Sequence, residues 1–339
     1  MTQTMNKINH KSLIVVGGRQ RKNALDLDEW RAYETAIIAV VDTATAKAEI
    51  VVEYQSPPEV CTENQPAIVF KAGDRRKDRF LVCTQTELIE FNCTTWQIIH
   101  YVTHPWLNDV HHVCYGDENS LMVADTGLDL VLKMDRNGTI LKNWNAGKSP
   151  TWNRFDQSVD FRRVATTKPH EAHVNFVFRA DNFWWSTRFN YQDAMRLDDS
   201  SIRLLIPTGN PHDGLVTSEG VYFSTTNGSI VGFDAATRTE IARYNLSRMT
   251  ESSQIIGWCR GMYFDNPDRV WIGFSRIRPT RFRKNLSWIK QGFRHLGTYG
   301  TLPTRIALYD LKRDELLREV NLERIGLNAV FGIYPLDNK

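Results

Sequence analysis

The feature that most constrains this sequence is a unit of four short apolar runs, separated by turn sequences, in residues 111–147. The runs centre on Val113, Leu121, Leu130 and Ile140, and the segments between them read Gly-Asp-Glu-Asn, Asp-Thr-Gly and Asp-Arg-Asn-Gly. Asn-Gly and Asp-Thr-Gly provide residues that tolerate the positive φ of a tight hairpin. Four antiparallel strands in this length predict one blade of a β-propeller, or an equal length of a β-sandwich.

The same order of short strands recurs along the chain, and the third strand of each copy ends in Asp or Asn. These markers are Asp42, Asn92, Asp135, Asp198, Asp234 and Asp310. A single blade cannot bury both of its faces, so six copies predict a closed ring. After the last marker, residues 327–334 read as a first strand whose expected partner is 13–16. We therefore predict an all-β, six-bladed propeller in one domain, 1–339, closed by N- and C-terminal strands in one blade.

Net charge, apolar run lengths and cysteine spacing limit the classes of protein to which this chain can belong. A net charge of +3 is too small to indicate nucleic acid by itself. No run approaches the roughly eighteen apolar residues that a membrane span requires. The start of the chain is polar, and residues 13–16 are too short for the apolar core of a secretion signal, so we expect a cytoplasmic protein. The five cysteines form no Cys-x-x-Cys unit, and we interpret them as packing residues.

Superposing the repeats on their first strands brings polar side chains to one equivalent position. They are His112, Asn175, Asp213, Arg260 and Asn328, with Ala67 the apolar exception. Because the first strand of each blade lines the central channel, these side chains are predicted to converge at one mouth of it. Further imidazoles lie close to the same level: His111, His170, His173 and His212. One such histidine usually only satisfies neighbouring backbone groups, but histidines in three successive blades predict a ligand site.

Two of the three roles open to this site use a divalent metal. Neutral imidazoles with one carboxylate suit Zn²⁺ or another transition metal. The candidate ligands for such an ion are His112, His173, His212 and Asp213. Alternatively, oxygens of Asn175, Asp213 and Asn328 suit Ca²⁺, which leaves the histidines as general acids or bases.

The third role needs no metal, because histidines and arginines can bind an anionic ligand. The candidate catalytic groups are His111, His170, Arg188 and Arg260. We expect Asn175 and Asn328 to contact the ligand, with Trp185 as an aromatic wall beside it.

The stretch from Ser120 to Asp135, Ser-Leu-Met-Val-Ala-Asp-Thr-Gly-Leu-Asp-Leu-Val-Leu-Lys-Met-Asp, resembles the core of the six-bladed NHL-type propellers. That core consists of a strand, Ala-Asp-Thr and a second strand that ends in Asp. One blade matches well, so the resemblance implies a fold and not a function. The same superfold resembles metal-dependent lactonases and esterases, whose channel cation is held by Glu, Asn and Asp. This chain has His and Arg at the matching levels instead.

A basic insertion at 275–300 interrupts blade six. Between residues 276 and 294 it alternates Arg and Lys with Phe, Leu, Trp and Ile, and from Leu286 its apolar positions suit a short amphipathic helix. Such a segment can cover the channel as a lid, lie on an anionic membrane surface or meet an acidic protein. It can also be a basic loop that packs its aromatic residues on the rim. Nucleic acid is the least expected partner, because the rest of the surface is balanced in charge.

Two functions follow from these features. The leading hypothesis is a small-molecule site at the channel mouth, with or without a metal, that acts on a polar or anionic substrate by hydrolysis, elimination or isomerisation. The alternative is a non-catalytic scaffold that binds a protein or an anionic membrane through its rim and the basic insertion.

Overall fold

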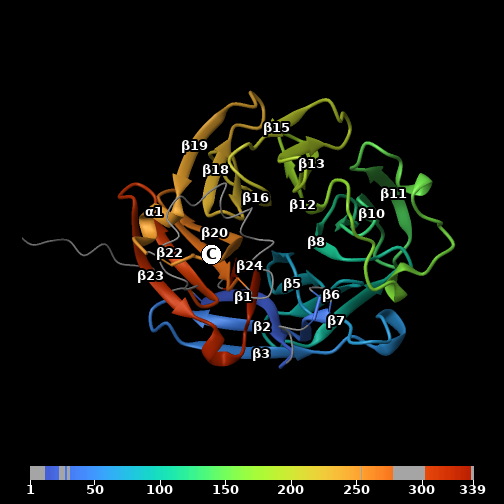
Figure 1. Ribbon diagram of the computed structural model, residues 1–339, viewed down its shortest axis with the longest axis horizontal. Coiled ribbons are helices and arrows are strands. Elements are labelled where there is room, and N and C mark those ends of the chain that lie inside the picture. The colour runs from blue at the N-terminus through green and yellow to red at the C-terminus, as the bar shows by residue number, and fades with distance from the viewer. Residues whose placement is uncertain (1–11, 23–26, 29–30, 253, 278–301, 337–339) are drawn as a thin grey trace, which may run out of the picture.

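The computed structural model describes residues 12–22, 27–28, 31–252, 254–277 and 302–336. Within these ranges, 24 strands form six four-stranded antiparallel sheets. The sheets are arranged as blades around one centre (Figure 1). The predicted six-bladed propeller is therefore confirmed.

The first three blades take up the N-terminal half of the chain. Blade one joins both ends of the chain in the order β24 (Ala329–Pro335), β1 (Ser12–Gln20), β2 (Tyr33–Asp42) and β3 (Ala48–Tyr54). Blade two contains β4 (Gly73–Arg76), β5 (Arg79–Cys83), β6 (Glu87–Asn92) and β7 (Ile98–Thr103). Blade three contains β8 (Val110–Tyr115), β9 (Leu121–Asp125), β10 (Leu130–Met134) and β11 (Ile140–Asn145).

The other three blades repeat this order, with the first strand nearest the centre (Figure 1). Blade four contains β12 (Val174–Ala180), β13 (Phe183–Arg188), β14 (Asp193–Arg196) and β15 (Arg203–Leu205). Blade five contains β16 (Pro211–Val216), β17 (Val221–Thr225), β18 (Ser229–Phe233) and β19 (Glu240–Asn245). Blade six contains β20 (Trp258–Asn266), β21 (Arg269–Ser275), β22 (Arg305–Asp310) and β23 (Glu315–Asn321).

The carboxylates and amides that mark the third strands shape the turns into the fourth strands. Oδ1 of Asp42 accepts hydrogen bonds of 2.8 Å from the backbone N–H groups of residues 44 and 45. Asn92, Asp135, Asp234 and Asp310 accept equivalent bonds two to four residues ahead. In blade four, Asp199 and not Asp198 accepts this bond, from Ser201. The recurring Asp is thus a local turn signal, which is why it repeats with the blades.

The chain ends close the ring as predicted. β1 pairs with β24, with Ile14 opposite Tyr334 and Val15 opposite Ile333. Leu13, Ile14 and Val15 have no exposed surface, and burying such side chains stabilises the fold by about 1.5–3 kcal/mol each. The phenol of Tyr334 also accepts a 2.6 Å hydrogen bond from the backbone N–H of Gly73 in blade two. The C-terminal strand therefore links blade one to its neighbour.

One predicted strand is wrong. The run Ala67–Phe70 is buried, but it is not the first strand of blade two, which begins at Gly73. The backbone N–H groups of Ile68 and Phe70 instead donate to carbonyls of Tyr33 and Gly17 in blade one. The charged segment 73–79, whose composition is typical of a solvated turn, holds β4 and the start of β5. Ala67–Phe70 is therefore apolar because it packs against blade one, and not because it is an inner strand.

Helical structure is sparse in the part of the chain that the structure describes. It consists of α1 (Leu246–Thr250) and a few short 3-10 turns. None of these helices is long and apolar enough to cross a membrane. The predicted helix in the basic insertion lies outside the described residues.

Candidate functional site

The innermost strands carry β-bulges near one mouth of the channel. The pairing register shifts in β8, β12, β16, β20 and β24. The residues skipped by these shifts are His111, Asn175, the pair Asp213 and Gly214, Gly261 and Phe331. A bulge re-aims the side chain of its extra residue, and bulges are common beside active sites. Here three of the bulged residues, His111, Asn175 and Phe331, line a pocket.

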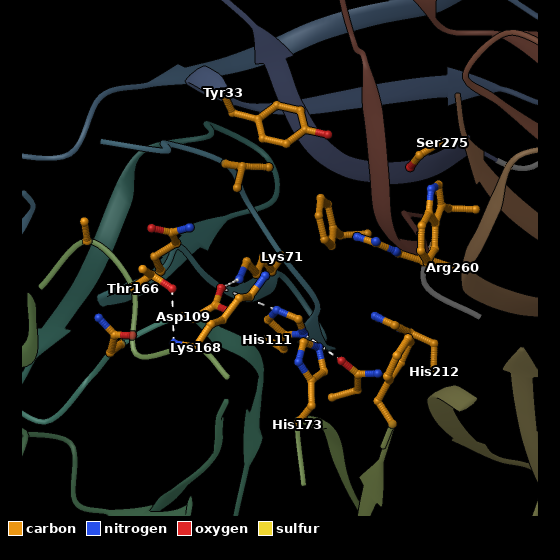
Figure 2. Close-up of a pocket in the computed structure, with 18 of the residues that line it drawn as sticks. Tyr33, Lys71, Asp109, His111, Thr166, Lys168, His173, His212, Arg260 and Ser275 are labelled. Atoms are coloured by element: carbon orange, nitrogen blue, oxygen red, sulfur yellow. Dashed lines mark hydrogen bonds and ion pairs between the residues drawn. The ribbon is translucent and has the colours of Figure 1, made fainter. Parts of the chain in front are cut away.

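The pocket at this mouth has a volume of about 350 Å³ (Figure 2). Its polar lining includes Lys71, Asp109, His111, Lys168, His173, Asn175, His212, Arg260 and Arg276. Its aromatic walls are Tyr33, Phe189, Trp258 and Phe331. These side chains come from all six blades or the loops that enter them, so the ring itself assembles the site.

A buried ion pair forms one side of the pocket. Nζ of Lys71 contacts Oδ1 of Asp109, and the Lys71 side chain is only 4% exposed. Burial lowers the pKa of Lys71 although Asp109 opposes the shift. Burial also acts on Asp109, but the ammonium of Lys71 holds the pKa of this carboxyl well below its usual range. The two groups form a buried salt bridge.

His111 lies between this ion pair and blade four. Its Nδ1 is 2.7 Å from Oδ1 of Asn175, and its Nε2 is 3.5 Å from Oδ1 of Asp109. Burial and the charge of Lys71 lower the pKa of His111 to about 3, although Asp109 opposes the shift. The His111 ring is therefore neutral at physiological pH.

His173 lies beside His111 in Figure 2. The rings of His111 and His173 meet edge to face, with centroids 4.9 Å apart. Nδ1 of His173 is 3.0 Å from Nδ1 of His170, which lies behind it and is bonded through Nε2 to the hydroxyl of Thr167 at 3.3 Å. Burial holds the pKa of His173 well below its usual value.

His212 is a buried polar side chain that lines the pocket without a hydrogen-bond partner. Its relative exposure is 2%, and neither ring nitrogen makes a hydrogen bond. Nδ1 lies 3.5 Å from Oδ1 of Asp213, which is ion-pair distance. Burial nevertheless lowers the pKa of His212. An unsatisfied imidazole in a cavity wall is costly to the fold and typical of a binding site.

Arg260 faces the cavity from blade six. Its guanidinium lies over the ring of Phe331 at 4.6 Å and near the ring of Trp258 at 5.5 Å. Aromatic neighbours hold the guanidinium plane in place in the wall of the pocket. Arg276, from the same blade, forms an ion pair with Glu323 at 2.7 Å.

Two of the predicted metal ligands lie outside the pocket lining. The ring of His112 stacks on Phe176 at 3.5 Å, and its Nε2 bonds the carbonyl of Gly73. Asp213 accepts hydrogen bonds from the hydroxyl of Ser224 and the backbone N–H of Gly261. The predicted set of His112, His173, His212 and Asp213 is therefore not brought together. Among the described residues, no group of three or more His, Cys, Asp and Glu side chains is arranged to hold a metal ion.

Three further predicted residues also have structural contacts away from the lining. Arg188 forms a buried pair with Asp193 and donates to the carbonyl of residue 146 at 2.8 Å. Trp185 is 1% exposed in the core between blades four and five. Oδ1 of Asn328 accepts a 3.0 Å bond from the backbone of residue 20. His111, His173, Asn175, His212 and Arg260 are the predicted residues that line the pocket.

Several lining residues were not anticipated, among them Lys71, Asp109, Lys168, Trp258 and Phe331. Lys71 directly follows the apolar run that was assigned to a strand, and Asp109 lies two residues before His111. For Asp109, the available signal was an aspartate directly before an inner strand, whereas Lys71 lies in a coil segment. Which of them face the channel depends on the bulges and turns, and these are not visible in the periodicity.

Comparisons with known proteins address the fold. No family model matches the chain, and no curated protein matches it. The resemblance to NHL propellers therefore stays a prediction.

Solved structures do match. A crystal structure at 1.35 Å of a protein of unknown function from Bacteroides caccae has a TM-score of 0.63 and 12% identity, over 97% of this chain and 100% of that one. The dihydro-heme d1 dehydrogenase NirN in complex with DHE has a TM-score of 0.44 and 11% identity, over 91% of this chain and 53% of that one. Likeness at such identity shows a fold and no activity. The comparisons therefore show a fold shared with the Bacteroides caccae protein.

Proposed function

We propose that the pocket at the channel mouth binds a small anionic ligand. The observation that carries this proposal is the charge of the lining. Four cationic side chains, Lys71, Lys168, Arg260 and Arg276, line one cavity, and carboxylates neutralise two of them, because Lys71 pairs with Asp109 and Arg276 with Glu323. Cations gathered in a low-dielectric cleft favour an anion far more than the same charges on an open surface.

The pocket also holds neutral imidazoles. His111 and His173 are held neutral by burial, and the ring nitrogens of His212 make no hydrogen bond. An anion that enters the pocket supplies acceptors for Arg260 and for His212. The walls formed by Phe189, Trp258 and Phe331 fit the apolar part of an organic acid better than an inorganic ion.

The same groups suit proton transfer to or from a bound substrate. An imidazole within hydrogen-bond reach of a substrate is the commonest general acid or base. This set of residues supports hydrolysis, elimination or isomerisation of an anionic substrate as the reaction class. A divalent metal and a role of the insertion at a membrane or protein surface stay predictions.

Calorimetric titration of small mono- and dicarboxylates and of phosphate, each beside its neutral amide or alcohol analogue, tests the proposal. The expected result is binding of at least one acid and none of its neutral analogue. Arg260→Gln should weaken that binding by about 10–100-fold, the value of a charge-assisted hydrogen bond.

The matched control is Arg179→Gln, which removes a cation from the surface of the same ring. Arg179 is half exposed and pairs with Asp117 outside the pocket lining. Its replacement should leave the affinity unchanged. Equal loss in both variants, or equal binding of acids and neutral analogues, would overturn the proposal.

A further inference from the structure

The hydrogen bonds around His111 fix which of its ring nitrogens carries the proton. Nδ2 of Asn175 donates to the carbonyl of Pro211 at 3.0 Å, so Oδ1 of Asn175 faces Nδ1 of His111. A carbonyl oxygen only accepts, and therefore Nδ1 must donate. In the neutral ring, Nε2 is then left with a lone pair.

A separate chain of bonds fixes His173 in the same tautomer. The hydroxyl of Thr167 donates to the carbonyl of Gly127 at 2.6 Å, so its oxygen accepts from Nε2 of His170 at 3.3 Å. Nδ1 of the neutral His170 is then an acceptor for Nδ1–H of His173, at 3.0 Å. Nε2 of His173 is therefore unprotonated as well.

His112 provides a contrast one residue away. Its Nδ1 accepts a 3.2 Å bond from the backbone N–H of Val177, and its Nε2 donates to the carbonyl of Gly73 at 3.1 Å. His112 is thus the opposite tautomer and has no nitrogen left for a ligand. Burial lowers its pKa to about 3, so it too is neutral.

We infer that the ligand is a small hydroxy acid, whose carboxylate meets the cationic side chains and whose hydroxyl donates to Nε2 of His111 or His173. The inference rests on the proposed function and specifies its ligand. Both rings line the same cavity as the cations, and they lie side by side in Figure 2. A simple carboxylate offers only acceptors and leaves both Nε2 atoms unmatched, whereas a hydroxyl group matches one of them.

The first arm of the test reads the tautomers without a ligand. Protein labelled with nitrogen-15 in its histidines is examined by long-range proton–nitrogen correlation NMR, and His→Gln variants assign the signals. His111 and His173 should carry the proton on Nδ1, and His112 on Nε2. A proton on Nε2 of both His111 and His173 would overturn the inference and leave the anion site intact.

The second arm compares ligands that differ by one hydroxyl group, malate with succinate and lactate with propionate. Each hydroxy acid should bind about tenfold more tightly than its partner, the value of one hydrogen bond of about 1.4 kcal/mol. Equal affinities would overturn the inference while the proposed function stands. If none of the four acids binds, both fall.

Asn175→Asp tests whether the tautomer of His111 determines the preference for a hydroxy acid. A carboxylate at Nδ1 favours the charged ring, so Nε2 of His111 becomes a donor. The preference for the hydroxy acid should fall at least severalfold while the affinity for succinate is kept or increased. Thr167→Val is the second variant and is used if Asn175→Asp does not fold. It removes the hydroxyl that bonds His170, and through His170 it affects His173. The NMR signals of His173 should therefore change, and those of His111 should not. Unchanged hydroxyl preference in the folded Asn175→Asp protein would exclude His111 as the acceptor.

Discussion

The ion pair between Lys71 and Asp109 is predicted to hold both the fold and the pocket, and Asp109→Asn tests it. The Lys71 side chain is 4% exposed and that of Asp109 is 21% exposed, so the ammonium left behind cannot be hydrated fully. Removing one partner of a buried pair costs about 3–5 kcal/mol. Asn is the suitable replacement, because Asp109 has a φ of 50°, which Asn also tolerates.

Urea unfolding at pH 7.5, followed by tryptophan fluorescence, measures this cost. Lys71→Met removes the charge that Asp109 neutralises. The double variant should therefore be more stable than the sum of the single losses predicts, with a coupling energy of about 2–3 kcal/mol. Glu240→Gln is the matched control, because it breaks the largely exposed pair with Arg243 and should cost no more than about 1 kcal/mol.

A loss of stability in Asp109→Asn no larger than that in Glu240→Gln would contradict this prediction. Losses of the two single variants, Asp109→Asn and Lys71→Met, that simply add would contradict it as well.

Two further predictions concern stability. His111 and His112 have pKa values of about 3 in the folded protein because of burial, against an ordinary 6.5. Between pH 3 and pH 6.5 the unfolded chain therefore binds more protons than the folded protein, and the free energy of unfolding should fall by about 4 kcal/mol in total between pH 7.5 and pH 5. Urea unfolding at pH 7.5 and at pH 5 checks this, and equal stability at the two pH values would speak against it. Tyr334→Phe leaves the backbone N–H of Gly73 without its acceptor. It should cost about 1–3 kcal/mol in the same assay, and a loss below about 0.5 kcal/mol would show that the link between the closing strand and blade two is unimportant.

Much of the fold is predictable from the sequence because its signals are local. Asp135 and four of the other third-strand markers bond the turn that follows them, so their recurrence counts the blades. The apolar runs at both termini, 13–16 and 327–334, similarly predict the closing pair. The run Ala67–Phe70 was misassigned because burial by another blade gives a coil segment the same composition as an inner strand.

The site is predictable only to within one or two residues along each inner strand. Alternation along a strand decides which side chain faces the channel, and one bulge reverses it. His112 was placed at the level of Asn175, but the bulge in β8 turns His111 into the pocket and His112 onto Phe176. Lys71 reaches the pocket from a coil segment, so no strand pattern could identify it.

The most direct test of the anion site is a crystal structure of the protein with a bromine-labelled succinate. Anomalous scattering locates the bromine independently of how the ligand is built. The account predicts one dominant peak inside the pocket at the channel mouth, with the carboxylates of the ligand in contact with Arg260 or His212. A dominant peak on the outer surface, or a ligand that leaves this pocket to water at saturating concentration, would contradict it.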